Sequence, residues 1–314
     1  MILPTCAAHA LETRAADHAW LIEGLWADQA VGIVGGEPKC CKSFLALDMA
    51  VAVATGRPCL RRFSVKRPGR VLLFPAEDAL HVVRDRLEGI CHAAGVPFGE
   101  LDVHVITAGA LRLDRADDQL RLKEAVARLR PALLVLDPFV RLHRIDENAS
   151  GEVAPILAWL RQLQRDHALA VAVVHHAKKG ASSARAGQAL RGSSEFHAWG
   201  DSNLYLRRAG EELRLTVEHR AAPSQEGLAL RLLQEGEALA LAPVLAAATP
   251  PSAPLELKER IVNALREKAD TLAGLRATCR VRTASLCETL ALLTGDGTVC
   301  KTGATYALSE PTLA

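Results

Sequence analysis

The stretch that decides the fold is Gly36-Glu37-Pro38-Lys39-Cys40-Cys41-Lys42-Ser43. It follows the apolar run Val31-Gly32-Ile33-Val34 and precedes Phe44-Leu45-Ala46-Leu47-Asp48-Met49-Ala50, so the local order is strand, tight loop and helix. The loop matches the pattern G-x-x-x-x-G-K-[ST] except at one position, and in that pattern backbone N–H groups surround phosphate oxygens at a helix N-terminus. We therefore predict a phosphate-binding loop that contacts a nucleotide from Gly36 to Phe44.

Two side chains of this loop carry the predicted chemistry, and a third departs from the pattern. Lys42 would reach the β- and γ-phosphates, and the Ser43 hydroxyl would bind Mg²⁺. Cys41 stands where glycine is usual, because the backbone there approaches the phosphates closely. If the position requires a positive φ, the cysteine costs about 1–3 kcal/mol. We expect weakened nucleotide binding, and the alternative is an ordinary helix N-terminus with Ser43 near its cap.

Composition narrows the class of protein. The chain has 314 residues, 49% of them hydrophobic, which suits one large domain and a smaller one. The net charge of +2 argues against a strongly basic nucleic-acid binder, so any such contact must use local patches. None of the eight cysteines shows C-x-x-C spacing, and we expect reduced thiols in a cytoplasmic protein. Neither a membrane span nor a secretory signal is expected.

The fold class follows from short apolar runs that alternate with helical patterns up to about residue 175. Continuous apolar strands between helices are typical of a parallel sheet covered on both faces. We expect such strands at Val31–Val34, Val71–Phe74, Val103–Ile106, Leu133–Leu136 and Ala170–Val174. The later runs predict antiparallel strands, at Leu204–Leu206, Leu213–Val217 and Leu228–Leu232. The sequence therefore predicts an α/β core with a mostly parallel sheet and C-terminal antiparallel strands.

The chain is expected to divide into a lead-in at 1–30, the α/β core at 31–242, a Pro- and Ala-rich linker at 243–254 and a small domain at 255–314. That domain reads as three helices followed by a hairpin, at Leu255–Lys268, Thr271–Cys279, Thr283–Leu293 and Val299–Leu308. This is the order of a winged helix-turn-helix, whose third helix would contact DNA together with Arg280 and Arg282. The alternative is a protein-docking module.

Two carboxylates follow predicted strands, at the edge where parallel sheets bind ligands. Asp137 ends the run Leu133–Leu136 and is expected to order Mg²⁺. Pro138 follows it, so the general base for water must come from elsewhere, and Glu77 after Val71–Phe74 is the candidate. The alternatives are a turn aspartate and a capping-box glutamate. Asp78 is expected as a helix N-cap.

A pair of histidines follows the next strand. His175 and His176 come after Ala170–Val174, where an imidazole can sense the γ-phosphate, although a structural role for one of the two is an alternative. A zinc pair lacks an apparent third ligand. The small polar stretch beyond them is either a solvated loop or a nucleic-acid contact through its basic residues, namely Lys178, Lys179, Arg185 and Arg191.

Taken in order, these motifs resemble the RepA-like branch of RecA-type P-loop ATPases, relatives of the hexameric replicative helicases of plasmids and phages. The resemblance spans about residues 18–242 and is carried by Gly36–Ser43, Pro75-Ala76-Glu77-Asp78, Leu134-Val135-Leu136-Asp137-Pro138, His175-His176-x-Lys178-Lys179-Gly180 and Arg191-Gly192-Ser193-Ser194. It implies a RecA-like core in a homo-oligomeric ring of the hexamer type, with ATP at each subunit boundary. It also implies catalytic roles for Lys42, Asp137, Glu77 and His176, and an arginine finger, donated to the neighbouring site, at Arg220.

We therefore predict a Mg²⁺-dependent ATPase that acts on DNA as a helicase-like motor or loader in replication or repair, with single-stranded DNA bound by the core loop. The added winged helix suggests an adaptor or initiator role and a DNA or protein partner. The alternative is a non-enzymatic regulator whose degenerate loop binds nucleotide poorly. A third hypothesis is a redox gate, because a helix N-terminus and Lys42 would lower the pKa of Cys41 and favour its thiolate.

Overall fold

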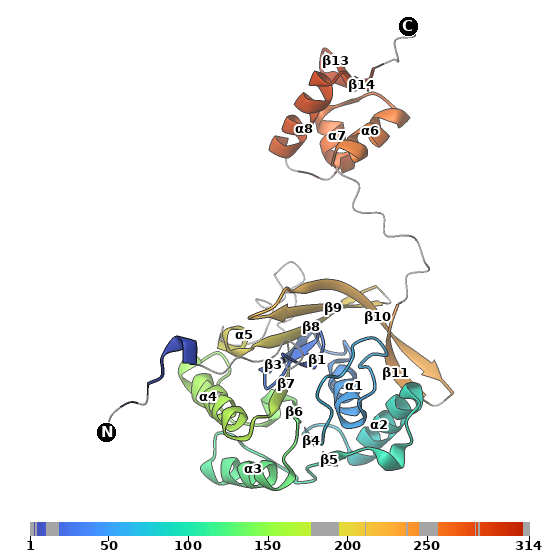
Figure 1. Ribbon diagram of the computed structural model, residues 1–314. Coiled ribbons are helices and arrows are strands. Elements are labelled where there is room, and N and C mark those ends of the chain that lie inside the picture. The colour runs from blue at the N-terminus through green and yellow to red at the C-terminus, as the bar shows by residue number, and fades with distance from the viewer. Residues whose placement is uncertain are drawn as a thin grey trace. The chain divides into compact units, whose positions relative to one another are not determined.

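The computed structural model describes residues 3, 5–10, 19–176, 195–210, 212–236, 238–244, 257–279, 281 and 283–309. The chain divides into two compact units, Met1–Val244 and Leu245–Ala314. The first unit is built on a nine-stranded sheet of order β11-β10-β9-β8-β3-β7-β6-β4-β5 (Figure 1).

The centre of the sheet is parallel and one side of it is antiparallel. The strands that run parallel to their neighbours are β3 (Val31–Gly36), β4 (Val71–Pro75), β5 (Val103–Val105), β6 (Leu133–Asp137) and β7 (Ala170–His176). The antiparallel extension is formed by β8 (Ser202–Ala209), β9 (Glu212–His219), β10 (Gln225–Glu235) and β11 (Ala238–Pro243). The predicted fold class, an α/β core with extra antiparallel strands, is confirmed.

Two details of that extension differ from the sequence interpretation. The strand predicted around Leu204–Leu206 is antiparallel only to β9, because its other edge pairs in parallel with β3. The strand β11 was not predicted, because its sequence is a short, uniformly apolar run that continues directly into the expected linker.

Helices cover both faces of the sheet. Figure 1 shows α1 (Lys42–Thr55) and α2 (Leu80–Ala94) on one side, and α3 (Ala116–Leu129) and α4 (Ser150–His167) on the other. Along each strand the side chains alternate between two hydrophobic cores, because successive side chains point to opposite faces of the sheet. In β6, Leu133 and Val135 join the core under α1, whereas Leu134 and Leu136 join the core under α4.

Close approach of β8 to β3 requires glycine in β3. A Cβ on Gly32 would lie 1.7 Å from the Ser202 carbonyl oxygen, far inside van der Waals contact. The expected lead-in contributes a small hairpin, β1 (Trp20–Ile22) and β2 (Trp26–Ala27), just before β3. The remaining short elements of this unit are η1 (Ala8–Ala10), η3 (Phe98–Glu100), η4 (Phe139–Arg141) and α5 (Glu195–Trp199).

The described residues of the second unit form three helices and a three-stranded sheet. Its elements are α6 (Leu257–Glu267), β12 (Asp270–Thr271), α7 (Leu272–Cys279), α8 (Thr283–Gly295), β13 (Val299–Thr302) and β14 (Thr305–Leu308). The strand order is β12-β14-β13, and Ile261, Leu275 and Leu286 form its core. Helices and hairpin follow one another as expected from the sequence, and their assignment as a winged helix stays a prediction.

Candidate functional site

The phosphate-binding loop joins β3 to α1 in a strained conformation. Gly36 has φ +154°, and a Cβ there would lie 2.3 Å from the carbonyl oxygen of Leu206, its register partner on β8. Cys41 is the N-cap of α1 and adopts the left-handed conformation, with φ 61° and ψ 28°. Lys39 is also left-handed, with φ 62°. The condition under which Cys41 costs free energy is therefore met.

Two side chains of the loop converge on one carbonyl oxygen. Cys40 Sγ donates to Glu37 O at 2.8 Å, and Lys42 Nζ donates to the same oxygen at 2.7 Å. Lys42 is buried, and this burial lowers its pKa, while the charges of Cys40 and Asp137 act in the opposite direction. The ammonium group thus lies inside the curve of the loop, where phosphate oxygens would compete with the Glu37 carbonyl.

A cavity of about 360 Å³ lies in front of the loop and gathers most of the predicted site. The predicted residues that line it are Lys39, Cys40, Cys41, Lys42, Ser43, Phe44, Glu77, Asp137 and His176. The other predicted loop residues, Gly36, Glu37 and Pro38, shape the loop without lining the cavity. Residues that are far apart in sequence meet here because β3, β4, β6 and β7 end at the same edge of the sheet.

Ser43 and Asp137 form the candidate magnesium site. Burial raises the pKa of Asp137 to about 6, and the hydrogen bond from the Ser43 hydroxyl works against that rise. A hydroxyl and a carboxylate are the hard oxygen ligands that Mg²⁺ prefers. Within the described ranges, no cluster of three or more His, Cys, Asp or Glu could hold a metal. A magnesium ion held by this pair would take its remaining ligands from phosphate oxygens and water.

Glu77 lies beside Asp137 because the strand ends before them are paired. Pro75 at the end of β4 is the register partner of Asp137. Glu77 is 40% exposed, lines the cavity and accepts a hydrogen bond at Oε1 from Arg141 Nε at 2.8 Å. The carboxylate is therefore at the predicted place, but it is held in an ion pair that the sequence did not reveal.

The expected N-cap role of Asp78 is wrong. The helix α2 begins at Leu80, its N-cap is Ala79, and no side chain caps it. Asp78 instead pairs with Arg86 at 2.5 Å, and the Arg86 guanidinium lies 5.1 Å from the centre of the Phe44 ring. Ala79, which is one residue closer to the helix, takes the N-cap position. The Asp78 side chain lines the cavity instead.

Sequence reasoning missed two arginines at this site. Arg86 lines the cavity from α2, and Arg208 from β8 donates to the Lys39 carbonyl at 3.0 Å. The sequence gives no indication that Arg86 belongs to the site, because it is only one of the polar positions of an amphipathic helix. Arg207 and Arg208, two basic residues directly after an apolar strand, could have been read as reaching the loop, because β8 continues three residues past the predicted strand end.

The two histidines have different surroundings. His176 lines the cavity at the end of β7. His175 is 1% exposed and stacks on Phe196, with ring centres 4.2 Å apart. Alternation along the strand separates them, so that one faces the nucleotide pocket and the other packs in the core.

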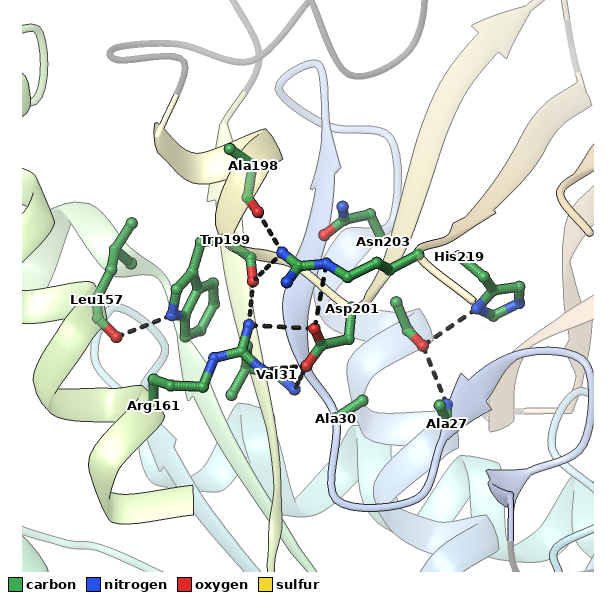
Figure 2. Close-up of polar contacts among 12 residues, drawn as sticks. Ala27, Ala30, Val31, Leu157, Arg161, Ala198, Trp199, Asp201, Asn203 and His219 are labelled. Atoms are coloured by element: carbon green, nitrogen blue, oxygen red, sulfur yellow. Dashed lines mark hydrogen bonds and ion pairs between the residues drawn. The ribbon is translucent and has the colours of Figure 1, made fainter. Parts of the chain in front are cut away.

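Arg220 lies outside this cavity. His219 pairs with Ser202 at the start of β8, whereas Gly36 pairs with Leu206 further along the same strand, so Arg220 is at the edge opposite the loop. Arg220 Nε is 3.5 Å from an oxygen of Asp201, a carboxylate that also binds Arg161 and the Val31 amide (Figure 2). Arg220 also donates to the carbonyl of Ala198 at 2.5 Å. Its side chain is 55% exposed.

The predicted DNA contacts lie outside the described residues. They are Lys178, Lys179, Arg185, Arg191, Arg280 and Arg282. Their roles therefore stay predictions.

The predicted thiolate at Cys41 is wrong. Burial raises the pKa of this thiol, and the nearby charges of Arg208, Arg86 and Lys42 do not reverse the direction. Desolvation disfavours the thiolate more than these cations favour it. The redox-gate hypothesis therefore loses its chemical basis.

The family follows from a comparison with known proteins. Residues 2–182, more than half of the chain, match the family described as AAA domain. The chain belongs to the AAA domain family. The matched AAA region includes the phosphate-binding loop, Glu77, Asp137 and both histidines.

A solved structure places this AAA chain among known folds. The crystal structure of the RadB recombinase is similar to it with a TM-score of 0.50 and 18% identity, over 68% of this chain and 91% of that one. The likeness shows that the two chains share a fold. In the described part of the AAA chain, no helix has the length and apolar character that crossing a bilayer demands.

Proposed function

We propose that the chain is a Mg²⁺-dependent ATPase that assembles as a homo-oligomeric ring and acts on single-stranded DNA. The observation that carries the proposal is the gathering of Lys42, Ser43, Glu77, Asp137 and His176 around one cavity. A phosphate-binding lysine, a magnesium pair, a candidate base and a polar sensor are the parts that phosphoryl transfer to water requires.

Each side chain has a role that its position suits. Lys42 exchanges the Glu37 carbonyl for the β- and γ-phosphates, with loop N–H groups around them. Ser43 and Asp137 would hold Mg²⁺, which supplies charge neutralisation on the phosphates when it is bound. Glu77 accepts the proton of the attacking water, and His176 hydrogen-bonds the γ-phosphate. Arg220 of one subunit would stabilise charge in the neighbouring subunit's site once it leaves Asp201.

The proposals for the ring and for DNA rest on different observations. The ring is supported by the sequence resemblance and by the exposed position of Arg220, away from its own pocket. The DNA role is supported by the same resemblance and by the likeness to a protein named a recombinase. The order of helices and hairpin in the second unit supports a winged helix that binds DNA or a protein partner.

The test compares Glu77→Gln with the native chain. The variant should bind a fluorescent ATP analogue with native affinity, while its turnover falls by about 10²–10⁴-fold because the proton acceptor is lost. Glu124→Gln, on the exposed face of α3, is the matched control and should hydrolyse ATP at the native rate. Native turnover by Glu77→Gln would contradict the assignment of the base.

The second candidate function is a regulator that does not hydrolyse ATP. The left-handed backbone of Cys41 favours it, because the strain opposes the loop conformation that surrounds phosphate. In that case the native chain and Glu77→Gln would show the same background turnover, and DNA or protein binding would be independent of ATP.

A further inference from the structure

A second cavity, of about 550 Å³, adjoins the nucleotide pocket and shares Glu77 with it. Two guanidinium groups, those of Arg112 and Arg141, stand in its wall beside the backbone of Gly109. A Cβ built on Gly109 would meet no atom within 4 Å, so the backbone there faces open space. The proposed hydrolysis uses neither arginine.

Arg141 connects this cavity to the candidate base. It ends η4, directly after the magnesium strand β6, and its Nε lies 2.8 Å from Glu77 Oε1. The two side chains are 59% and 40% exposed, so the pair is screened by water and contributes little to stability. A weakly held, exposed ion pair is easily exchanged for another anion. While it is formed, it occupies one oxygen of the carboxylate that must accept a proton.

Arg112 makes the cavity positive. Its guanidinium donates to the carbonyl oxygens of Arg141 and of His143, the latter at 3.4 Å, which ties it to the η4 segment. Across the ranges that the structure describes, no carboxylate lies within ion-pair distance of this guanidinium. The cavity thus has two guanidinium groups against the single carboxylate of Glu77. The unbalanced charge and the planar donors favour an oxyanion.

We propose that the second cavity binds a phosphate-type oxyanion between Arg112 and Arg141, and that the anion draws Arg141 away from Glu77. The carboxylate is then released toward the nucleotide pocket, where it accepts the proton of water. This release rests on the proposed role of Glu77, whereas the anion site stands on the cavity alone. The shared ligand chemistry is a phosphate oxygen, supplied by a nucleic-acid phosphodiester or by inorganic phosphate.

Binding is tested on the full chain without nucleotide, by titration with a single-stranded oligodeoxynucleotide and, separately, with inorganic phosphate. Arg112→Gln and Arg141→Gln should each weaken one of these titrations by about tenfold, because a charged hydrogen-bond donor is lost. Arg144→Gln, an exposed arginine of the same segment, is the matched control and should bind as the native chain does. The phosphate-binding loop is intact in every variant.

The two titrations identify the source of the anion. A loss confined to the oligonucleotide assigns a phosphodiester, and a loss confined to inorganic phosphate assigns the free ion. If Arg112→Gln and Arg141→Gln bind both probes as Arg144→Gln does, the site is overturned.

The rate of ATP turnover without any added anion tests whether the ion pair with Arg141 restrains Glu77. Arg141→Gln should hydrolyse ATP faster than the native chain and respond less to the anion that binds, a gain that general damage to the fold does not produce. An unchanged or lower rate would overturn the release of Glu77. If neither the native chain nor Arg141→Gln turns over ATP, the proposed ATPase function and the release both fall, and the titrations still decide the anion site.

Discussion

Cys41 affects the phosphate-binding loop through its backbone conformation and through the charge state of its thiol. Its backbone is left-handed, which a side chain opposes and glycine permits. Its thiol is kept neutral by burial, although Arg208, Arg86 and Lys42 lie near it. The departure from the loop pattern therefore acts through the backbone, and a neutral thiol adds no charge that would repel phosphate.

Cys41→Gly should make the chain more stable by about 1 kcal/mol, because the left-handed strain is removed. It should also bind a fluorescent ATP analogue at least as tightly as the native chain. Denaturant unfolding and a nucleotide titration measure the two effects. Gln29→Gly is the control, since Gln29 is also left-handed, with φ 52°, but lies outside the loop. A drop in nucleotide affinity for Cys41→Gly would show that the thiol itself assists binding.

The raised pKa of Asp137 should make the stability of the fold depend on pH. Burial raises its pKa to about 6, so the folded chain binds a proton that the unfolded chain has already lost. The free energy of unfolding should therefore fall as the pH rises from about 4 to 6, and the contribution is constant above that range. Asp137→Asn should remove this slope in denaturant unfolding curves.

The same titration should govern the effect of magnesium. Mg²⁺ requires the carboxylate, so the gain in ATP-analogue affinity on adding Mg²⁺ should be full at pH 8 and largely lost at pH 5. Binding without Mg²⁺ serves as the reference at each pH. An equal gain at both values would mean that Asp137 does not take part in holding the ion.

At the scale of elements, the pairing of β3 with β8 sets the position of the loop. Gly32 and Gly36 both allow β8 to lie against β3, and the carbonyls that approach them belong to Ser202 and Leu206. The parallel pairing of these strands then fixes where β3 ends and where the loop begins. The antiparallel strands beyond β8 are thus part of the support of the site.

Gly32→Ala should destabilise the core strongly. The new Cβ would lie 1.7 Å from the Ser202 carbonyl oxygen, so β8 must move away or the strand pairing must break. We expect a loss of about 3 kcal/mol or more, and a lower melting temperature in thermal unfolding. Gly151→Ala, where a Cβ meets no neighbouring atom, is the matched control and should leave the melting temperature unchanged or higher.

The elements of the parallel core could be predicted because each strand is a continuous apolar run between helices. The predicted strand Leu133–Leu136 and the observed β6 differ by one residue. The strand β11 escaped prediction because its short, uniformly apolar run continues directly into the stretch expected as a linker, and it is the edge strand of the sheet. Arg141 also escaped, because its ion pair with Glu77 joins separate crossovers and leaves no periodic signal in the sequence. Arg86 escaped because it is one of several polar residues on an amphipathic helix. Asp137, Glu77 and His176 could be predicted because each lies at or just after the end of a strand, and a parallel sheet brings such ends together.

At the scale of the whole molecule, the chain consists of two units with separate hydrophobic cores. Leu275 lies in the core of the second unit, and the phosphate-binding loop lies in the first. Each unit can therefore respond to its own ligand or substitution.

Calorimetry of the full chain should show two unfolding transitions. A saturating Mg²⁺–ATP analogue, at about 100 times its Kd, should stabilise only the first unit, by about 2.7 kcal/mol. Leu275→Ala should lower only the second transition, through the loss of about 2–5 kcal/mol of core packing. A joint shift of both transitions in either experiment would show that the units unfold as one.

The contact between Gly36 and Leu206 has a mechanical consequence. The backbone of β8 touches the phosphate-binding loop there, and Arg208 on the same strand fastens the Lys39 carbonyl. The outer ribbon of β9, β10 and β11 continues from that strand without a hinge in its pairing to β8. A force applied to β9 would thus be transmitted through its pairing with β8 to Gly36 and Lys39 of the loop, and a change in the conformation of the loop would in turn displace β8.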